Sequence, residues 1–310
     1  MNKNDPKSLK AAARQAAAAA SYDPQKLILI HSAVAAAAGL VLALIGYLLQ
    51  LQIDNTGGLS GVGNRAMLET ARSVLDVLFQ LALPFWQIGF VYAAIRIIRH
   101  RNAEPYNLGE GFRRFRAVLK TQMLVVLFTC GMVFACYYAA YFLYAMTPWS
   151  RNLMDAMMSG NEETLMAAME EALLPIGILM LPPLLAVGTW FGYRMRLVDY
   201  VIMDDGDLSG LAAIRQGWKL TKGNIRHMLK LDLSYWWYYG LTILTAAVAY
   251  GDMILPALGV TLPLEEAAGF YLFMAASYVL QLLLLWWQGS RVQLSYAAFY
   301  QAALPREEEE

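Results

Sequence analysis

Six stretches of the chain are apolar and free of Asp, Glu, Lys and Arg, and polar segments separate them. They are residues 27–52, 77–95, 121–150, 172–193, 233–251 and 267–290. A spanning helix needs about 20 mostly apolar residues, because few structures satisfy the backbone in lipid. The pattern therefore predicts an all-α fold, a polytopic membrane helix bundle of six transmembrane helices. With their flanks, the spans are about 27–52, 73–98, 119–147, 172–195, 231–254 and 267–292.

The predicted membrane domain covers residues 27–300. A basic, alanine-rich segment, residues 1–26, precedes it and is expected to form a short helix at the cytosolic surface. An acidic cytosolic tail, residues 301–310, follows it. The first apolar run is too long for the core of a cleavable signal peptide, so we interpret it as the first span.

Basic residues are concentrated in alternate loops. If the N-terminus is cytosolic, 21 of the 24 Lys and Arg residues fall in cytosolic segments, and only Arg65, Arg72 and Arg151 lie outside. Cytosolic loops carry an excess of Lys and Arg in membrane proteins. The distribution therefore predicts that both termini are cytosolic, and an odd number of spans would destroy it.

The second large cytosolic loop contains an amphipathic segment. Asp207 is the expected N-cap, Gly223 the expected residue after the helix, and Asp204 adds negative charge near the helix N-terminus. The apolar positions recur at i, i+3 and i+7, and basic side chains flank them, as in a helix that lies in the membrane interface. The expected lipid contacts are Leu211, Ile214, Arg215, Trp218, Lys219 and Lys222.

The first cytosolic loop shows the same pattern and predicts a second interfacial amphipathic helix. Its expected lipid contacts are Phe112, Phe115, Arg116 and Lys120. A shift of 99 residues lays this segment on the second one, with Gly111 on Gly210. Two interpretations stay open: an internal duplication, or chance similarity between two basic interfacial helices.

Charged residues gather at the cytosolic ends of the later spans. They are Arg194, Arg196, Asp199, Asp232 and Arg291. Ionisable groups are costly near the membrane, so they tend to pair or to line a pathway. The cluster is interpreted either as an ion-pair belt, in which Asp232 pairs with one of the arginines, or as a polar vestibule for a proton or solute.

Glycines and prolines interrupt the fourth apolar stretch. Gly188 and Gly192 form a GxxxG pattern after Pro175, Pro182 and Pro183. The pattern predicts close helix packing and a kink. The alternative is a broken helix around a solute site, as in some transporters.

The chain carries no sequence signature of an enzyme. It has no HExxH, P-loop, GxGxxG or Ser/His/Asp pattern, and its two cysteines have no metal-binding spacing. We therefore expect no catalytic, cofactor-binding or metal-binding residues, and no nucleic-acid partner. The expected partners are the lipid bilayer, anionic lipid headgroups and another membrane protein.

The most distinctive stretch is "YRMRLVDYVIMDDGDLSGLAAIRQGWKLTKGNIRHMLKLDLSYWW", from Tyr193 to Trp237. "GEGFRRF" in the first loop and "AAFY" at Ala297–Tyr300 accompany it. Together they resemble the bacterial family catalogued as domain of unknown function 975. The resemblance implies a multi-pass integral membrane protein of the bacterial cytoplasmic membrane, and it carries over no catalytic residue because the family has no assigned activity.

Three functions follow as hypotheses. The favoured one is a non-enzymatic membrane protein that organises a partner or senses the membrane surface, because the most patterned segments lie along the cytosolic interface. The alternative is a small-solute transporter or permease subunit, motivated by the repeat and the interrupted fourth span. An enzyme embedded in the membrane comes third.

Overall fold

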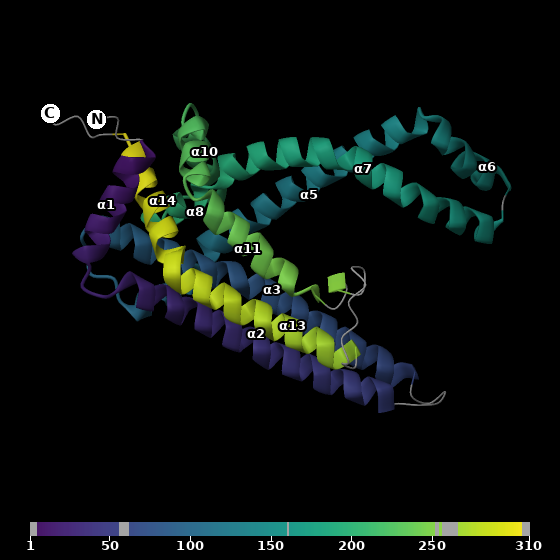
Figure 1. The fold of residues 1–310 in the computed structure, drawn as a ribbon, viewed down its shortest axis with the longest axis horizontal. Coiled ribbons are helices and arrows are strands. Elements are labelled where there is room, and N and C mark those ends of the chain that lie inside the picture. Colours follow the sequence, from purple (N-terminus) through teal and green to yellow (C-terminus); the bar gives the residue numbers. More distant parts are fainter. Residues whose placement is uncertain (1–4, 56–61, 160, 252–253, 256–265, 306–310) are drawn as a thin grey trace. The chain divides into compact units, whose positions relative to one another are not determined.

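The computed structural model describes residues 5–55, 62–159, 161–251, 254–255 and 266–305. Every regular element in these ranges is a helix (Figure 1). The prediction of an all-α fold is therefore confirmed. Residues 306–310, most of the predicted acidic tail, lie outside the described residues.

Among the described residues, five helices are long and apolar enough to cross a membrane. They are Pro24–Ile53, Arg65–Ile98, Phe115–Ala145, Glu162–Asp204 and Leu272–Ala303. They belong to α2 (Pro24–Asn55), α3 (Val62–Ile98), α5 (Phe115–Ala145), α7 with α8 (Glu162–Met195, Val198–Asp204), and α13 with α14 (Glu266–Leu284, Ser290–Ala303). At five of the six predicted spans, the structure thus has a helix that is long and apolar enough to cross a membrane.

The predicted fifth span is divided in the structure. Its residues fall on α10 (Ile225–Leu233) and α11 (Trp236–Val248). At 1.5 Å per residue, the 13 residues of α11 extend about 20 Å, less than the roughly 30 Å of a hydrocarbon core. Residues 252–253 and 256–265, which follow it, lie outside the described residues. A count of six spans therefore stays a prediction.

The chain separates into two compact units. One consists of Met1–Val118, Asp199–Asp207 and Gly223–Glu310, and the other of Leu119–Val198 and Leu208–Lys222. The predicted membrane domain, residues 27–300, contributes to both units.

In the first unit α2 and α3 are joined by a reciprocal polar contact between His31 and Trp86. The Trp86 indole donates to the His31 carbonyl at 2.7 Å, and the His31 ring lies 2.9 Å from the Trp86 carbonyl. The two rings stack with centroids 5.3 Å apart. Buried polar groups are costly unless they are hydrogen-bonded, so this pair keeps the two apolar helices in one register.

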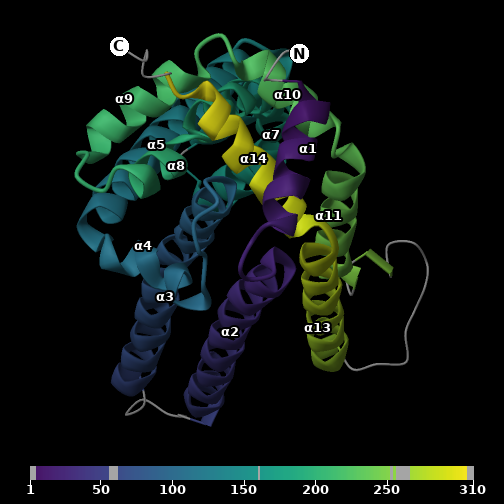
Figure 2. The ribbon, with the colours of Figure 1, turned by 90° about the vertical axis from the view of Figure 1, so that its left-hand side faces the viewer.

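The N-terminal helix α1 (Pro6–Ala18) packs on the protein. It lies beside α14 in both views (Figure 1, Figure 2). Leu9, Ala13 and Ala16 follow the i, i+4, i+7 spacing of one helical face, and all three are buried. Lys10 donates to the carbonyl of Ser234 at 2.8 Å and lies over the Tyr235 ring. The predicted short helix is present, and its apolar face is covered by protein.

Two glycines bring the segment after α3 close to that helix. This segment contains the 3₁₀ helix η2 (Pro105–Gly109) and α4 (Glu110–Arg113). A Cβ on Gly89 would lie 1.8 Å from the Leu108 carbonyl oxygen, and one on Gly111 would lie 1.9 Å from that of Phe85. Only glycine allows this approach, because any side chain would overlap the facing backbone.

In the second unit α5 and α7 are connected through the 3₁₀ helix η3 (Pro148–Ser150) and α6 (Arg151–Ser159). A small cluster consists of Ala140, Tyr144, Leu153, Ala172 and Ile176. Asn161 caps α7, because its side chain accepts a hydrogen bond from the Glu163 N–H at 3.0 Å. The α6–α7 connection is therefore held by local capping and by one apolar cluster.

Helix α7 runs without a break through all three of its prolines. The alternative of a broken helix is therefore wrong for this segment. The expectation of close packing at Gly188 and Gly192 is also wrong within the described chain, since a Cβ at either would meet nothing within 4 Å. Transmembrane helices tolerate proline where neighbouring groups satisfy the freed carbonyls.

Candidate functional site

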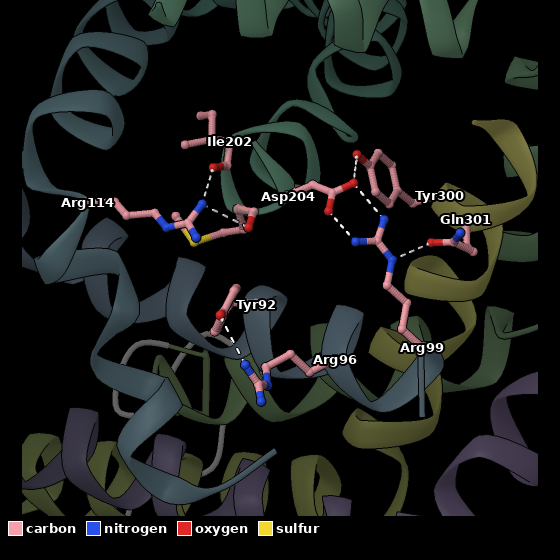
Figure 3. A network of polar contacts seen from close by, with 9 residues as sticks. Tyr92, Arg96, Arg99, Arg114, Ile202, Asp204, Tyr300 and Gln301 are labelled. Carbon is pink, nitrogen blue, oxygen red and sulfur yellow. Dashed lines mark hydrogen bonds and ion pairs between the residues drawn. The ribbon is translucent and has the colours of Figure 1, made fainter. Parts of the chain in front are cut away.

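A network of polar contacts joins three segments that lie about a hundred residues apart in the sequence (Figure 3). Arg99 follows the end of α3, Asp204 ends α8, and Tyr300 lies on α14. The Arg99 guanidinium donates two hydrogen bonds to the Asp204 carboxylate, one of them 2.7 Å from Nη2 to Oδ2. The Tyr300 hydroxyl donates to the same Oδ2 at 2.9 Å. Such bidentate arginine pairs fix geometry as well as charge.

The Arg99–Asp204 ion pair is largely shielded from solvent. The side-chain exposures are 24% for Arg99 and 20% for Asp204. The hydrogen bond to Asp204 raises the pKa of Arg99, against an opposing effect of burial. Arg99 Nε also donates to the Gln301 side chain at 2.9 Å. The network therefore links the end of α3 to α8 and to α14 through charge-assisted hydrogen bonds.

Arg114 holds the last turn of α8 from another direction. Its Nη1 donates to the carbonyls of Ile202 and Met203 at 3.1 and 3.0 Å (Figure 3). A cation is favourable there, because the C-terminal carbonyls of a helix lack partners and carry partial negative charge. A Cβ on Gly206 would lie 2.8 Å from Arg114 Nη1, so a larger residue would displace the guanidinium.

The sequence interpretation placed Asp204 and Asp207 at the start of the loop helix, and the structure corrects both. Asp204 belongs to the C-terminus of α8, with Arg99 as its ionic partner. The N-cap of α9 (Gly210–Thr221) is Ser209, whose side chain accepts from the Ala212 N–H at 3.3 Å. The helix ends as predicted, before Gly223, whose φ is +83°.

The five charged residues of the predicted cluster are divided between the two units. Arg194 and Arg196 belong to the second unit, and Asp199, Asp232 and Arg291 to the first. Arg194 Nη1 donates to the Trp218 carbonyl in the last turn of α9 at 3.2 Å. The guanidiniums of Arg194 and Arg196 lie over the rings of Trp190 and Tyr193.

Two tyrosines donate to the Asp232 carboxylate. The Tyr239 hydroxyl lies 2.8 Å from Oδ1, and the Tyr296 hydroxyl donates to the same oxygen. These hydroxyls come from α11 and α14, so the carboxylate connects three helices. The arginine partner expected for Asp232 stays a prediction.

Helix α9 has two opposite faces. One contains Gly210, Ala213, Ile214, Gly217, Leu220 and Thr221, which are all buried. A Cβ on Gly210 would lie 2.9 Å from Thr121 Oγ1, and one on Gly217 would lie 2.7 Å from a Val198 methyl. Small residues on this face therefore let the helix pack closely within its unit.

The opposite face of α9 is exposed. Its residues are Leu211, Arg215, Trp218, Lys219 and Lys222, and we call them the α9 outer face. At 100° per residue they cover roughly 100° of arc. Leu211 is 43% exposed and Trp218 36%. Ile214, which the sequence assigned to the lipid contacts, is only 4% exposed and belongs to the buried face.

The predicted helix in the first loop takes a different form. Phe112 lies on the four-residue α4, Arg114 interrupts the helix, and Phe115 begins the long α5. Arg116 and Lys120 are exposed on α5. Both phenylalanine rings stack on Phe85, with centroids 5.8 and 4.8 Å away. The expected separate amphipathic helix is thus absent from this described segment, which is helical but, unlike α9, is interrupted at Arg114 and continues into a long apolar helix.

A scan against protein families matches nearly the whole chain to one family model. The model described as "Protein of unknown function (DUF975)" matches residues 1–306. The chain belongs to the DUF975 family. No curated protein and no solved structure matches it.

The DUF975 match covers every segment of the Arg99–Asp204–Tyr300 network. The sequence resemblance already included Asp204, in the acidic turn, and Tyr300, in "AAFY". Their contact with each other and with Arg99 was missed, since no local pattern relates residues that far apart. Among the described residues, no group of three or more His, Cys, Asp or Glu could hold a metal ion.

Proposed function

We propose that this DUF975 protein is a non-enzymatic, multi-pass protein of the bacterial cytoplasmic membrane that senses the membrane surface or organises a membrane partner there. It has six spans, both termini are cytosolic, and α9 lies in the cytosolic interface. The five long apolar helices and the concentration of Lys and Arg in alternate loops support this arrangement.

The observation that carries the proposal is the α9 outer face. It combines two large apolar side chains with three cations, while the opposite face is occupied by protein contacts. Leucine and tryptophan bury apolar area at the acyl boundary, and long basic side chains reach back to the phosphates. Each cation near an anionic surface contributes about 1 kcal/mol, so three of them contribute roughly 3 kcal/mol.

Lipid-attached quenchers test this placement. A fluorophore is attached at Leu211→Cys in full-length protein whose Cys130 and Cys136 are replaced by serine, in vesicles containing anionic lipid with quenchers at headgroup depth. We expect strong quenching at position 211. The matched control is Asp207→Cys, which is exposed but precedes the helix. Equal quenching at the two positions would exclude an interfacial α9.

Charge is tested by Arg215→Gln, Lys219→Gln and Lys222→Gln together in the Leu211→Cys protein. We expect the quenching to fall, and high salt to lower it in the parent protein but not in this variant. If neither the triple substitution nor high salt changes the quenching, the α9 outer face contacts protein and not anionic lipid.

Transport is the second hypothesis. It rested on a repeat and on an interrupted fourth span, and the structure contains a continuous α7 and two dissimilar loop segments. Surface sensing rests on exposed groups that the described chain contains. We therefore prefer it over transport.

A further inference from the structure

A polar cavity of about 430 Å³ lies within the first unit, beside α1. The C-terminal half of α1, the first residues of α2, the beginning of α11 and the first turns of α14 form its walls. Its volume falls in the range of small-molecule sites, roughly 300–1,000 Å³. None of the residues of the α9 outer face contributes to it.

Positive charge predominates around the cavity. Lys10, Arg14 and Arg291 line it, against the single carboxylate of Asp23. That carboxylate accepts a hydrogen bond from the Gln25 N–H at 2.9 Å, at the start of α2. Neither guanidinium forms an ion pair within the part of the chain that the structure describes. Among the described residues, the cavity lining therefore carries more cations than carboxylates.

Neutral donors complete the lining. Tyr235, Ser290 and Ser295 line the cavity. The Tyr235 hydroxyl lies 2.9 Å from Ser295 Oγ, which donates to the Arg291 carbonyl at 2.8 Å, so the protons of these two hydroxyls already have acceptors. Gln288 comes from a π-helical segment, Leu285–Gly289, that separates α13 from α14. Single π-helical turns are rare in proteins, and those that occur are often found at functional sites. Hydroxyl and amide groups beside cations are the donors that oxyanions require.

Lys10 is poised to respond to an anion. Burial lowers the pKa of Lys10, and the positive charge of Arg14 acts in the same direction. A bound anion would offset this repulsion and favour the charged ammonium. Burial and the neighbouring cation therefore disfavour the charged form of Lys10, which a bound anion would stabilise.

We propose that this cavity binds a phosphate group, carried either by an anionic phospholipid headgroup or by a small soluble phosphate ester. Arg14, Arg291 and Lys10 supply the charge, and the Ser290 hydroxyl and the Gln288 amide supply neutral donors. Since α1 contributes two of the cations, occupation of the cavity would fix α1 against α14.

The test uses the full-length protein in neutral detergent, with Arg215, Lys219 and Lys222 changed to glutamine so that the α9 outer face does not contribute. Binding is measured by titration calorimetry and by the shift of the unfolding temperature. The probes are inorganic phosphate, glycerol 3-phosphate, and micelles doped with phosphatidylglycerol or, as the neutral comparison, phosphatidylcholine. The cavity variant is Arg14→Gln with Arg291→Gln.

The matched control is Lys7→Gln, which removes one charge from the same helix outside the cavity. We expect at least one phosphate probe to bind, the cavity variant to lose about tenfold or more in affinity, and Lys7→Gln to bind as the parent does. A response to phosphatidylglycerol alone identifies a lipid headgroup. A response to the soluble probes identifies a small phosphate ester.

The proposal is overturned if none of the phosphate probes binds, or if the cavity variant and Lys7→Gln bind equally well. If the double variant does not fold, the affinity of Arg14→Gln is compared with that of Lys7→Gln instead. Arg14 is exposed, so its replacement leaves the packing of α1 intact. The tested protein lacks the three basic residues of α9. Phosphate binding in this protein would therefore show that the cavity binds independently of the function proposed for α9.

Discussion

Asp204 connects α8 to two other segments through a single carboxylate. Removing one partner of a buried ion pair costs about 3–5 kcal/mol, and partial exposure lowers this figure. Because Arg99 and Asp204 are about a fifth to a quarter exposed, we expect Asp204→Asn to destabilise the protein by about 2 kcal/mol. The measurement is the unfolding temperature in detergent.

Asp205→Asn is the matched control, since its side chain is exposed and adjacent. We expect a change within about 0.5 kcal/mol for this control. Combining Asp204→Asn with Arg99→Gln should restore part of the loss, because no uncompensated charge remains. Equal stability of the two single variants would contradict the role assigned to the network.

Asp232 allows a second residue-scale prediction. Asparagine keeps an acceptor for Tyr239 and Tyr296 but loses the charge. If an arginine pairs with Asp232, Asp232→Asn should lower the unfolding temperature, and neutralising that arginine as well should restore part of it. A stable Asp232→Asn with no rescue would show that the tyrosines alone hold this side chain.

At this scale the sequence could identify Asp232 as a charged residue at a span boundary, but it could not identify the partners of Asp204. Arg99 and Asp204 are 105 residues apart. Hydrophobic periodicity reports which face of a helix is apolar, and it contains no information on which distant ends meet. Asp204 also precedes a helix, so its assignment to α9 was locally reasonable.

Among the elements, the segment after α3 depends on glycine. Gly111→Ala would put a methyl group against the Phe85 carbonyl, and Gly89→Ala would put one against that of Leu108. Overpacking costs about 1–3 kcal/mol, and backbone overlap places these changes at the upper end. Chemical unfolding should reveal both losses. Gly109→Ala is the control, since its Cβ would meet nothing within 4 Å, and an equal loss there would contradict the packing.

The extent of α9 could be predicted better than its orientation. The apolar spacing and Gly223 indicated a helix that ends where α9 ends. The buried face of α9 contains the small residues Gly210 and Gly217, which allow close packing against Thr121 and Val198. The sequence alone does not show which groups these glycines contact. The same limit explains the first loop, where Arg114 leaves the helical conformation and donates to the end of α8.

For the whole molecule, the apolar runs predicted the all-helical class and six spans, and at five of these the described structure has a helix that is long and apolar enough to cross a membrane. These features depend on lengths and composition, which the sequence contains directly. The division of residues 225–248 into α10 and α11, and the π-helical turn before α14, depend on local packing. Neither has a periodic signal of its own.

The orientation of the chain in the membrane is the central claim, because a surface sensor requires α9 to be cytosolic. Single cysteines are introduced at Met158, which is 89% exposed on α6, and at Asp207, before α9, in a protein without Cys130 and Cys136. A membrane-impermeant thiol reagent is then applied to intact spheroplasts. We expect labelling at position 158, and labelling at 207 only after permeabilisation; the reverse pattern, or labelling of both in intact spheroplasts, would contradict the account.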